Sequence, residues 1–121
     1  MNKNKVDSGS WQQDQKTDQR IKNLIDYLQK NVENKILLKD LSGIALLSPC
    51  HLQRIFKKAV GLTPREYLLQ LRLEKTKQLL EQGLPLSEIV HLTGFTDQSH
   101  LTRTFKNLTG MTPKDFNKRN Q

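Results

Sequence analysis

The sequence is poor in cysteine and has no long apolar run. Cys50 is the single cysteine among 121 residues, which excludes an internal disulfide framework and is typical of a reducing compartment. No apolar run approaches the roughly 18 residues that a membrane-spanning helix needs. We therefore expect neither a membrane span nor a signal-peptide core. The length fits one domain with a modest hydrophobic core.

Acidic residues are scarce relative to basic ones. The chain has 12 Asp and Glu against 20 Lys and Arg, a net charge of +8 at pH 7. This excess favours a polyanionic partner, and nucleic acid is the commonest such partner for a small protein. A cationic helix on a membrane surface would show a similar balance, so charge alone does not identify the partner.

The features of a catalytic site are missing. The three histidines, His51, His91 and His100, lack the spacing of a metal site. Cys50 and His51 are neighbours, and neighbouring side chains diverge by about 100° on a helix. No glycine-rich phosphate loop follows a strand pattern. We therefore expect no enzymatic activity, no metal and no cofactor.

The chain contains an internal repeat. Residues 51–67 read HLQRIFKKAVGLTPREY, and 49 residues later, residues 100–116 read HLTRTFKNLTGMTPKDF. His-Leu, Arg, Phe-Lys and Gly-x-Thr-Pro followed by an aromatic residue recur in register. A period of roughly 45–50 residues indicates one supersecondary unit per copy, and two copies are too few for a solenoid. The repeat predicts a duplicated domain.

Each copy begins with a helix that has recognisable ends. Ser48 is a candidate N-cap with Pro49 in the first helical position, and Gly61 is a stop signal. Asp97 is the candidate cap of the second copy. The spacing predicts inward faces made of Leu52, Ile55, Phe56 and Ala59 in the first helix and of Leu101, Phe105 and Leu108 in the second.

The outward faces of these two helices are polar and basic. They consist of Cys50, Gln53, Arg54, Lys57 and Lys58, with His51 at the edge, and of Ser99, Thr102, Arg103 and Lys106. Amide, hydroxyl and guanidinium groups read base edges, and lysines hold phosphates. A solvated helix face would look similar, but equivalent faces at equivalent positions on two helices favour DNA recognition.

Apolar periodicity and caps predict seven helices and no strand, an all-α fold. We expect residues 1–17 to form a disordered polar tail or linker and residues 18–118 to form a double helix-turn-helix domain. Its first unit is expected at about 18–61, a long linker helix at about 64–82 and the second unit at about 86–118.

The predicted helix starts follow from caps. Thr17 or Asp18 would cap the first helix, and Thr63 with Pro64 and Glu66 forms a capping box for the linker helix. The linker helix would be roughly 28 Å long, against roughly 34 Å for one turn of B-DNA. It could therefore hold two reading units one helical turn apart.

Residues 94–106 read GFTDQSHLTRTFK and are followed by GMTP at 110–113 and by Phe116. With the two helix-turn-helix units, this segment resembles the DNA-binding domain of the AraC/XylS family of bacterial transcription regulators, over residues 18–118. Many relatives attach this domain to an N-terminal sensor domain. Residues 1–17 could be either a native start or the remnant of a linker.

Other segments carry the same resemblance. Arg72 with Leu79 and Leu80 is similar to the linker-helix pattern of the family. Residues 51–54 and 101–106 resemble the short, single-domain members related to MarA, SoxS and Rob.

The resemblance implies major-groove base contacts from Cys50, Gln53, Arg54, Gln98, Ser99 and Arg103. We expect phosphate or flanking contacts from His51, Lys57, Lys58, His100, Thr102 and Lys106. The chain departs from the family at four positions. Cys50 replaces a tryptophan of the short members, Leu37 a capping Ser or Thr, Leu46 a turn glycine and Thr76 a linker-helix alanine. The last three are expected to weaken packing without abolishing the fold.

The sequence therefore predicts a DNA-binding transcription regulator that reads two adjacent major-groove segments of a bacterial promoter. The alternative is a protein-interaction module that reuses the helix-turn-helix fold, which would expose large apolar anchors on the reading faces. The expected partner is double-stranded DNA, with RNA polymerase if the protein is an activator. We expect a monomer in the cytoplasm, nucleoid-associated when bound and without a membrane partner.

Overall fold

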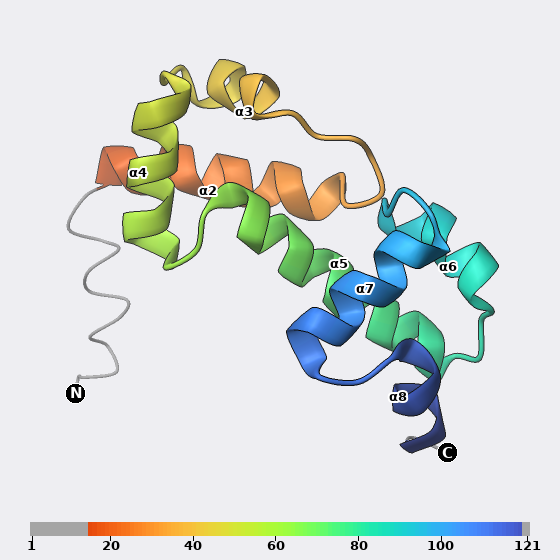
Figure 1. The fold of residues 1–121 in the computed structure, drawn as a ribbon. Coiled ribbons are helices and arrows are strands. Elements are labelled where there is room, and N and C mark those ends of the chain that lie inside the picture. The colour runs from red at the N-terminus through yellow and green to blue at the C-terminus, as the bar shows by residue number, and fades with distance from the viewer. Residues whose placement is uncertain (1–14, 120–121) are drawn as a thin grey trace. The chain divides into compact units, whose positions relative to one another are not determined.

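The computed structural model describes residues 15–119, and these form seven helices and no strand (Figure 1). In chain order the helices are α2 (Gln15–Lys30), α3 (Leu38–Ala45), α4 (Pro49–Val60), α5 (Pro64–Glu81), α6 (Leu86–Thr93), α7 (Gln98–Thr109) and α8 (Pro113–Arg119). The all-α prediction is confirmed. None of these helices is both long and apolar enough to cross a lipid bilayer.

The start of the first helix differs from the prediction. Helix α2 already includes Gln15, so Thr17 and Asp18 lie inside it and the proposal that either caps it is wrong. Glutamine and lysine are good helix formers, which allows a helix to extend beyond its apolar stripe. Residues 1–14 of the expected polar tail lie outside the described residues.

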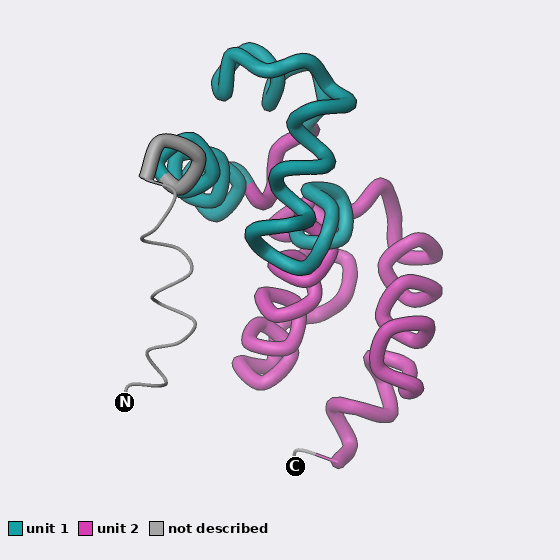
Figure 2. The backbone as a smooth tube through the Cα atoms, turned by 90° about the vertical axis from the view of Figure 1, so that its left-hand side faces the viewer, with its two compact units in different colours: residues 1–31, 36–67 teal, residues 32–35, 68–121 magenta. Residues whose placement is uncertain are grey.

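The described chain divides into two compact units (Figure 2). Unit 1 contains residues 15–31 and 36–67, and therefore α2, α3, α4 and the first turn of α5. Unit 2 contains residues 32–35 and 68–119, and therefore the rest of α5 with α6, α7 and α8. Turns of three residues between α3 and α4 and of four residues between α6 and α7 make one helix-turn-helix in each unit.

Helix α2 supplies one side of the core of unit 1. Ile21, Leu24 and Leu28 recur at helical spacing and are fully buried. Helix α2 contacts both α3 and α4, and Leu52 and Phe56 of α4 are also fully buried. These inward side chains determine which face of α4 remains at the surface.

Unit 2 has its own apolar cluster. It consists of Leu73, Leu80, Ile89, Val90, Phe95, Leu101 and Phe105. The prediction that Leu108 faces inward is wrong, because 44% of its surface is exposed. Leu101 and Phe105 define the centre of the buried face of α7, and Leu108 lies at its edge in the last turn, where fewer side chains can cover it.

The end of α3 carries backbone strain. Leu46 has φ 58° and ψ 41°, and it is the one residue other than glycine with a positive φ in the described chain. The left-handed region suits glycine, so the leucine is unfavourable here. Its side chain is 86% exposed. The departure from the family at this position therefore strains the backbone rather than the core.

We expect Leu46→Gly to raise the free energy of unfolding by about 0.5–1 kcal/mol, as measured by urea denaturation. Relief of left-handed strain, about 1–2 kcal/mol, should exceed the entropic cost of a new glycine, about 0.5–1 kcal/mol. The matched control is Leu46→Ala, which keeps the Cβ and should change stability by less than about 0.5 kcal/mol. Equal stabilities for the two variants would refute the strain.

The first turn of α3 and the interior of α5 accommodate the other two departures. Leu37 precedes α3 without a side-chain cap, its N–H donates to Asp40 Oδ2 at 3.0 Å, and its carbonyl accepts from the N–H of Asp40 at 2.9 Å. Thr76 is fully buried, and its hydroxyl donates to the carbonyl of Arg72 at 2.8 Å. The N–H of Leu37 and the hydroxyl of Thr76 each have a hydrogen-bond partner, so neither group is left unpaired.

Candidate nucleic-acid interface

Helices α4 and α7 begin in the same way. The Ser48 hydroxyl accepts a hydrogen bond from the N–H of His51 at 3.2 Å, and Asp97 Oδ1 accepts one from the N–H of His100 at 2.8 Å. Each side chain satisfies an N–H group that the first turn of a helix leaves unpaired. Both caps predicted from the repeat are confirmed.

The two helices also end in the same way. Gly61 follows α4 with φ 92°, and Gly110 follows α7 with φ 83°. The N–H of Gly61 donates to the carbonyl of Lys57, and the N–H of Gly110 donates to the carbonyl of Lys106, both at 2.8 Å. The left-handed conformation stops both helices after the same number of residues, so their side chains are presented in the same rotational order.

A second helix start follows each of these helices. Ahead of α5, Thr63 and Glu66 form the predicted capping box, with N–H···O distances of 2.9 and 3.1 Å. The N–H of Thr63 lowers the pKa of Glu66 below its ordinary value of 4.5. Ahead of α8, the hydroxyl of Thr112 accepts from the N–H of Asp115 at 3.1 Å.

Each repeat contains an aromatic pair that involves its last residue. Phe56 of α4 meets Tyr67 edge to face with ring centroids 5.9 Å apart, and Phe105 of α7 meets Phe116 in the same way at 5.5 Å. Such pairs are favourable beyond the area they bury. In each unit the pair holds the inward face of the first helix of the repeat against the helix that follows.

The burial of the inward faces leaves the opposite faces in solvent. The exposed side chains there include Cys50, His51, Gln53, Arg54, Lys57 and Lys58 on α4 and Gln98, Ser99, Arg103 and Lys106 on α7. Thr102 is half-buried. We call the ten exposed side chains named above, six on α4 and four on α7, the reading faces.

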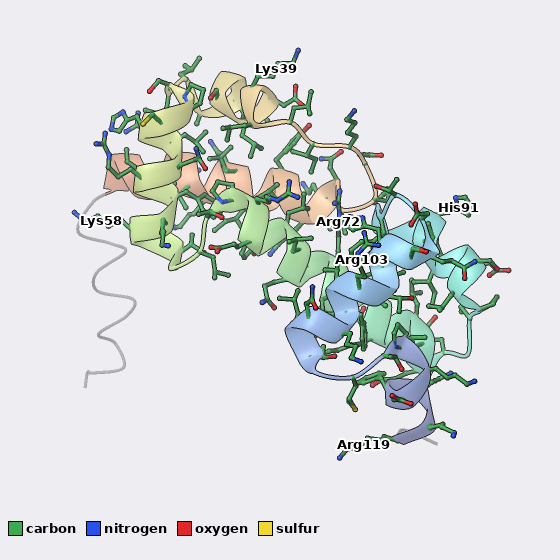
Figure 3. The ribbon with its side chains drawn as sticks, viewed as in Figure 1. Lys39, Lys58, Arg72, His91, Arg103 and Arg119 are labelled. Carbon is green, nitrogen blue, oxygen red and sulfur yellow. The ribbon has the colours of Figure 1, made fainter. Side chains whose placement is uncertain are left out.

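An arginine occupies the middle of each reading face. Arg54 is two positions from both Leu52 and Phe56, so a rotation of about 100° per residue places it about 160° from each buried side chain. Arg103 has the same relation to Leu101 and Phe105 (Figure 3 labels Arg103). Each guanidinium therefore points away from the core of its own unit.

These two guanidinium groups have no carboxylate partner in the part of the chain that the structure describes. The ion pairs there are Lys30–Asp26 and Lys77–Glu74, on α2 and α5. Arginine presents its donors in a rigid fork that matches paired acceptors such as O6 and N7 of guanine. Both arginines are therefore available to an external acceptor.

His100 has a different environment from His51, its equivalent in the repeat. The ring of His100 lies 5.3 Å from that of Phe95 at an angle of 81°, and its Nδ1 accepts a long hydrogen bond of 3.5 Å from the N–H of Thr96. His51 is exposed. In unit 2 the histidine therefore packs against the turn. Phe95, an aromatic residue in that turn, is the sequence feature that could have indicated this contact.

Exposed large apolar residues lie mostly elsewhere. They are Leu37, Ile44 and Leu46 in and around α3, Leu92 on α6 and Leu108 on α7. The reading face of α4 has none, and Leu108 lies at the edge of α7. A protein-binding surface on the reading faces would require such anchors near its centre. Within the described residues, no group of three or more His, Cys, Asp or Glu side chains could hold a metal ion.

Comparison with known proteins agrees with this geometry. A family model described as a helix-turn-helix domain matches residues 41–119. A solved AraC-type transcriptional regulator from Chromobacterium violaceum superposes with a TM-score of 0.75 at 26% identity, over 84% of this chain and 91% of that one. The chain belongs to the AraC-type helix-turn-helix family of DNA-binding transcription regulators. The resemblance inferred from residues 94–116 is confirmed.

Two relatives found by sequence similarity are longer than this chain. The probable transcriptional regulator LumQ of Photobacterium leiognathi is 40% identical over 78 residues, which are 63% of this chain and 32% of LumQ. The transcriptional regulator YbfI of Bacillus subtilis is 39% identical over 79 residues, 65% of this chain and 29% of YbfI. The matched region thus spans about a third of the length of these relatives.

A further solved structure has the same AraC-type fold. The C-terminal domain of AraT, a response regulator from Geobacillus stearothermophilus, gives a TM-score of 0.78 at 25% identity, over 83% of this chain and 84% of that one.

Proposed function

We propose that this AraC-type domain binds double-stranded DNA sequence-specifically, with α4 and α7 each reading one major-groove segment of a bacterial promoter. The observation that carries the proposal is the equivalence of the two reading faces. Both helices have a side-chain N-cap and a glycine C-cap at equivalent positions, the same buried side and an exposed arginine at the same position. If these faces were only solvated helix surfaces, nothing would require the same features at equivalent positions on two helices.

The side chains of the reading faces divide into two roles. We assign base contacts to Cys50, Gln53 and Arg54 of α4 and to Gln98, Ser99 and Arg103 of α7. We assign phosphate or flanking contacts to His51, Lys57, Lys58, His100, Thr102 and Lys106. The first turns of a recognition helix lie deepest in the groove. Arginine can bind guanine through two hydrogen bonds, whereas an ammonium group holds a phosphate as a point charge.

We assign the domain no catalytic role and no cofactor. One relative, AdaA of Bacillus subtilis, is named a bifunctional transcriptional activator and DNA repair enzyme, but the matched 59 residues are 28% of it. The net charge of +8 suits a nucleic-acid partner. We propose a cytoplasmic location, association with the nucleoid when bound, a monomeric domain and contact with RNA polymerase if the protein activates.

The test is selection of bound sequences from random duplex DNA, followed by footprinting on the selected site. We expect a bipartite site of roughly 20 base pairs with two protected segments about one helical turn apart. Arg54→Ala and Arg103→Ala should each reduce protection of one segment only. Protection of one continuous segment of about five or six pairs, unaffected by changes in α7, would refute reading by two helices.

Cys50 provides an independent test of how α4 meets DNA. Its thiol is exposed and lies in the first turn of α4, where bound DNA would cover it. We expect specific duplex to slow labelling by a bulky thiol reagent and prior labelling to block binding. Cys50→Ser should change affinity little, because a thiol is a weak hydrogen-bonding group. Equal labelling rates with and without duplex would show that this face does not enter the groove.

A further inference from the structure

A short segment of the chain belongs to the opposite unit from its neighbours. Residues 32–35 connect α2 to α3, and both helices are in unit 1, yet the segment itself is part of unit 2. Figure 2 shows it as a short magenta stretch between teal elements. The side chain of Val32 is 7% exposed. The chain therefore enters unit 2 once between α2 and α3, before it enters unit 2 again in α5.

Arg72 of α5 holds this segment through two hydrogen bonds. Its Nε donates to the carbonyl of Val32 at 3.0 Å, and its Nη2 donates to the carbonyl of Asn34 at 2.9 Å. Arg72 is half-buried and is labelled in Figure 3. Two N–H groups of one planar fork bind two carbonyls of one segment, which fixes the direction of the segment as well as its position.

Gly94 leaves room for the same segment. It lies in the turn between α6 and α7 with φ +81°, and a Cβ at this position would lie 2.6 Å from the carbonyl oxygen of Val32 and 2.8 Å from Nε and Nη2 of Arg72. A side chain at position 94 would therefore collide with the Val32 carbonyl and with the Arg72 guanidinium, which form a hydrogen bond with each other. The turn of the second helix-turn-helix thus abuts the 32–35 segment. We call Arg72, Gly94 and residues 32–35 the clasp.

We infer that Arg72 is a positioning residue that couples the two reading helices. Helix α5 is one covalent connection between the units, and the clasp holds within unit 2 the short segment whose two ends continue into α2 and α3 of unit 1. Two attachments restrain the motion of one unit relative to the other more than one does. This inference rests on the proposed function, because coupling matters only if both helices bind DNA together.

Coupling has a measurable consequence for DNA binding. When two linked modules bind neighbouring sites, a restrained connection raises the effective concentration of the second module at the matching spacing and lowers it at others. The wild-type domain should therefore prefer one spacing between half-sites. Loss of the clasp should reduce affinity at that spacing by about tenfold, with little change at spacings one or two base pairs longer or shorter. Affinity for an isolated half-site should not change.

The experiment measures DNA affinity for the wild type, Arg72→Met and Arg72→Lys. Each protein is tested on the selected bipartite duplex, on duplexes with one or two base pairs inserted or removed between the half-sites, and on each half-site alone. Arg72→Met keeps length but removes every donor, and Arg72→Lys keeps the charge without the fork. Lys75→Met is the matched control, because it removes one positive charge from the same helix. Thermal midpoints and active fractions are measured in parallel.

A flattened spacing preference in Arg72→Met, with wild-type half-site affinities and an intermediate Arg72→Lys, supports the inference. An equal loss at every spacing and on half-sites, or no change, overturns it. If Arg72→Met does not fold, Arg72→Lys decides by the same criteria. Failure of the wild type itself to bind a bipartite site would count against the proposed function, whereas a wild-type spacing preference that survives loss of the fork would count only against the clasp.

Discussion

Replacing Phe105 by alanine is expected to lower the free energy of unfolding by about 3–5 kcal/mol. The ring is 1% exposed and meets Phe116 edge to face, so its removal opens a cavity in unit 2 and breaks the aromatic pair. Small domains typically have about 5–15 kcal/mol in total, so the variant should unfold at a much lower urea concentration. DNA binding should weaken because less protein is folded.

The control is Leu108→Ala in the same helix. Because Leu108 is 44% exposed, its truncation removes little buried area and should cost less than about 1 kcal/mol. Phe56→Ala should repeat the large effect in unit 1, where the ring is fully buried. A Phe105→Ala variant with lost DNA binding and an unchanged thermal midpoint would place that ring on the DNA side instead.

Replacing Arg103 by alanine is expected to weaken binding to the selected DNA site by about 1–3 kcal/mol, or roughly 5- to 150-fold. Its guanidinium lies in the middle of the reading face of α7 and is not paired with a carboxylate of the described chain. The loss should be largest for the cognate base pair, so preference at one position of one half-site should relax. Arg54→Ala should do the same in the other half-site.

Lys57→Ala distinguishes base reading from charge. Lys57 lies one turn after Gln53 on the reading face of α4 and is exposed, and we assign it to a phosphate. Its loss should weaken binding evenly across sequences and reduce the slope of log K against log salt by about 1. If both arginine variants also lost affinity equally on all sequences, the assignment of base contacts to Arg54 and Arg103 would be wrong.

The ends and faces of most helices were predictable because their causes are local. Ser48, Asp97 and Thr63 each cap a helix through groups three residues away, and Gly61 and Gly110 end helices through their own backbone freedom. The repeat then placed Arg54 and Arg103 opposite the buried residues without any knowledge of tertiary contacts. The start of α2 was missed because polar residues before Ile21 carry no periodic signal.

The features that the sequence did not reveal depend on residues far apart in the chain. Leu108 is exposed and Ala59, its equivalent in the repeat, is half-buried, because the cover over the last turn of a helix comes from other elements. Arg72 was recognisable as part of a linker-helix pattern, but its hydrogen bonds reach carbonyls 40 and 38 residues away. Backbone carbonyls leave no trace in residue identity.

The sequence by itself therefore determined the helices, their duplicated reading faces and the family, since caps, periodicity and the repeat are all written in residue type at short separation. Only the tertiary structure decided that the segment after α2 belongs to unit 2, that Arg72 binds it and that Gly94 makes room for it. Those contacts join the Arg72 side chain to main-chain carbonyls 40 and 38 residues away and place a glycine against one of them, and residue type does not show which distant carbonyls folding will bring close.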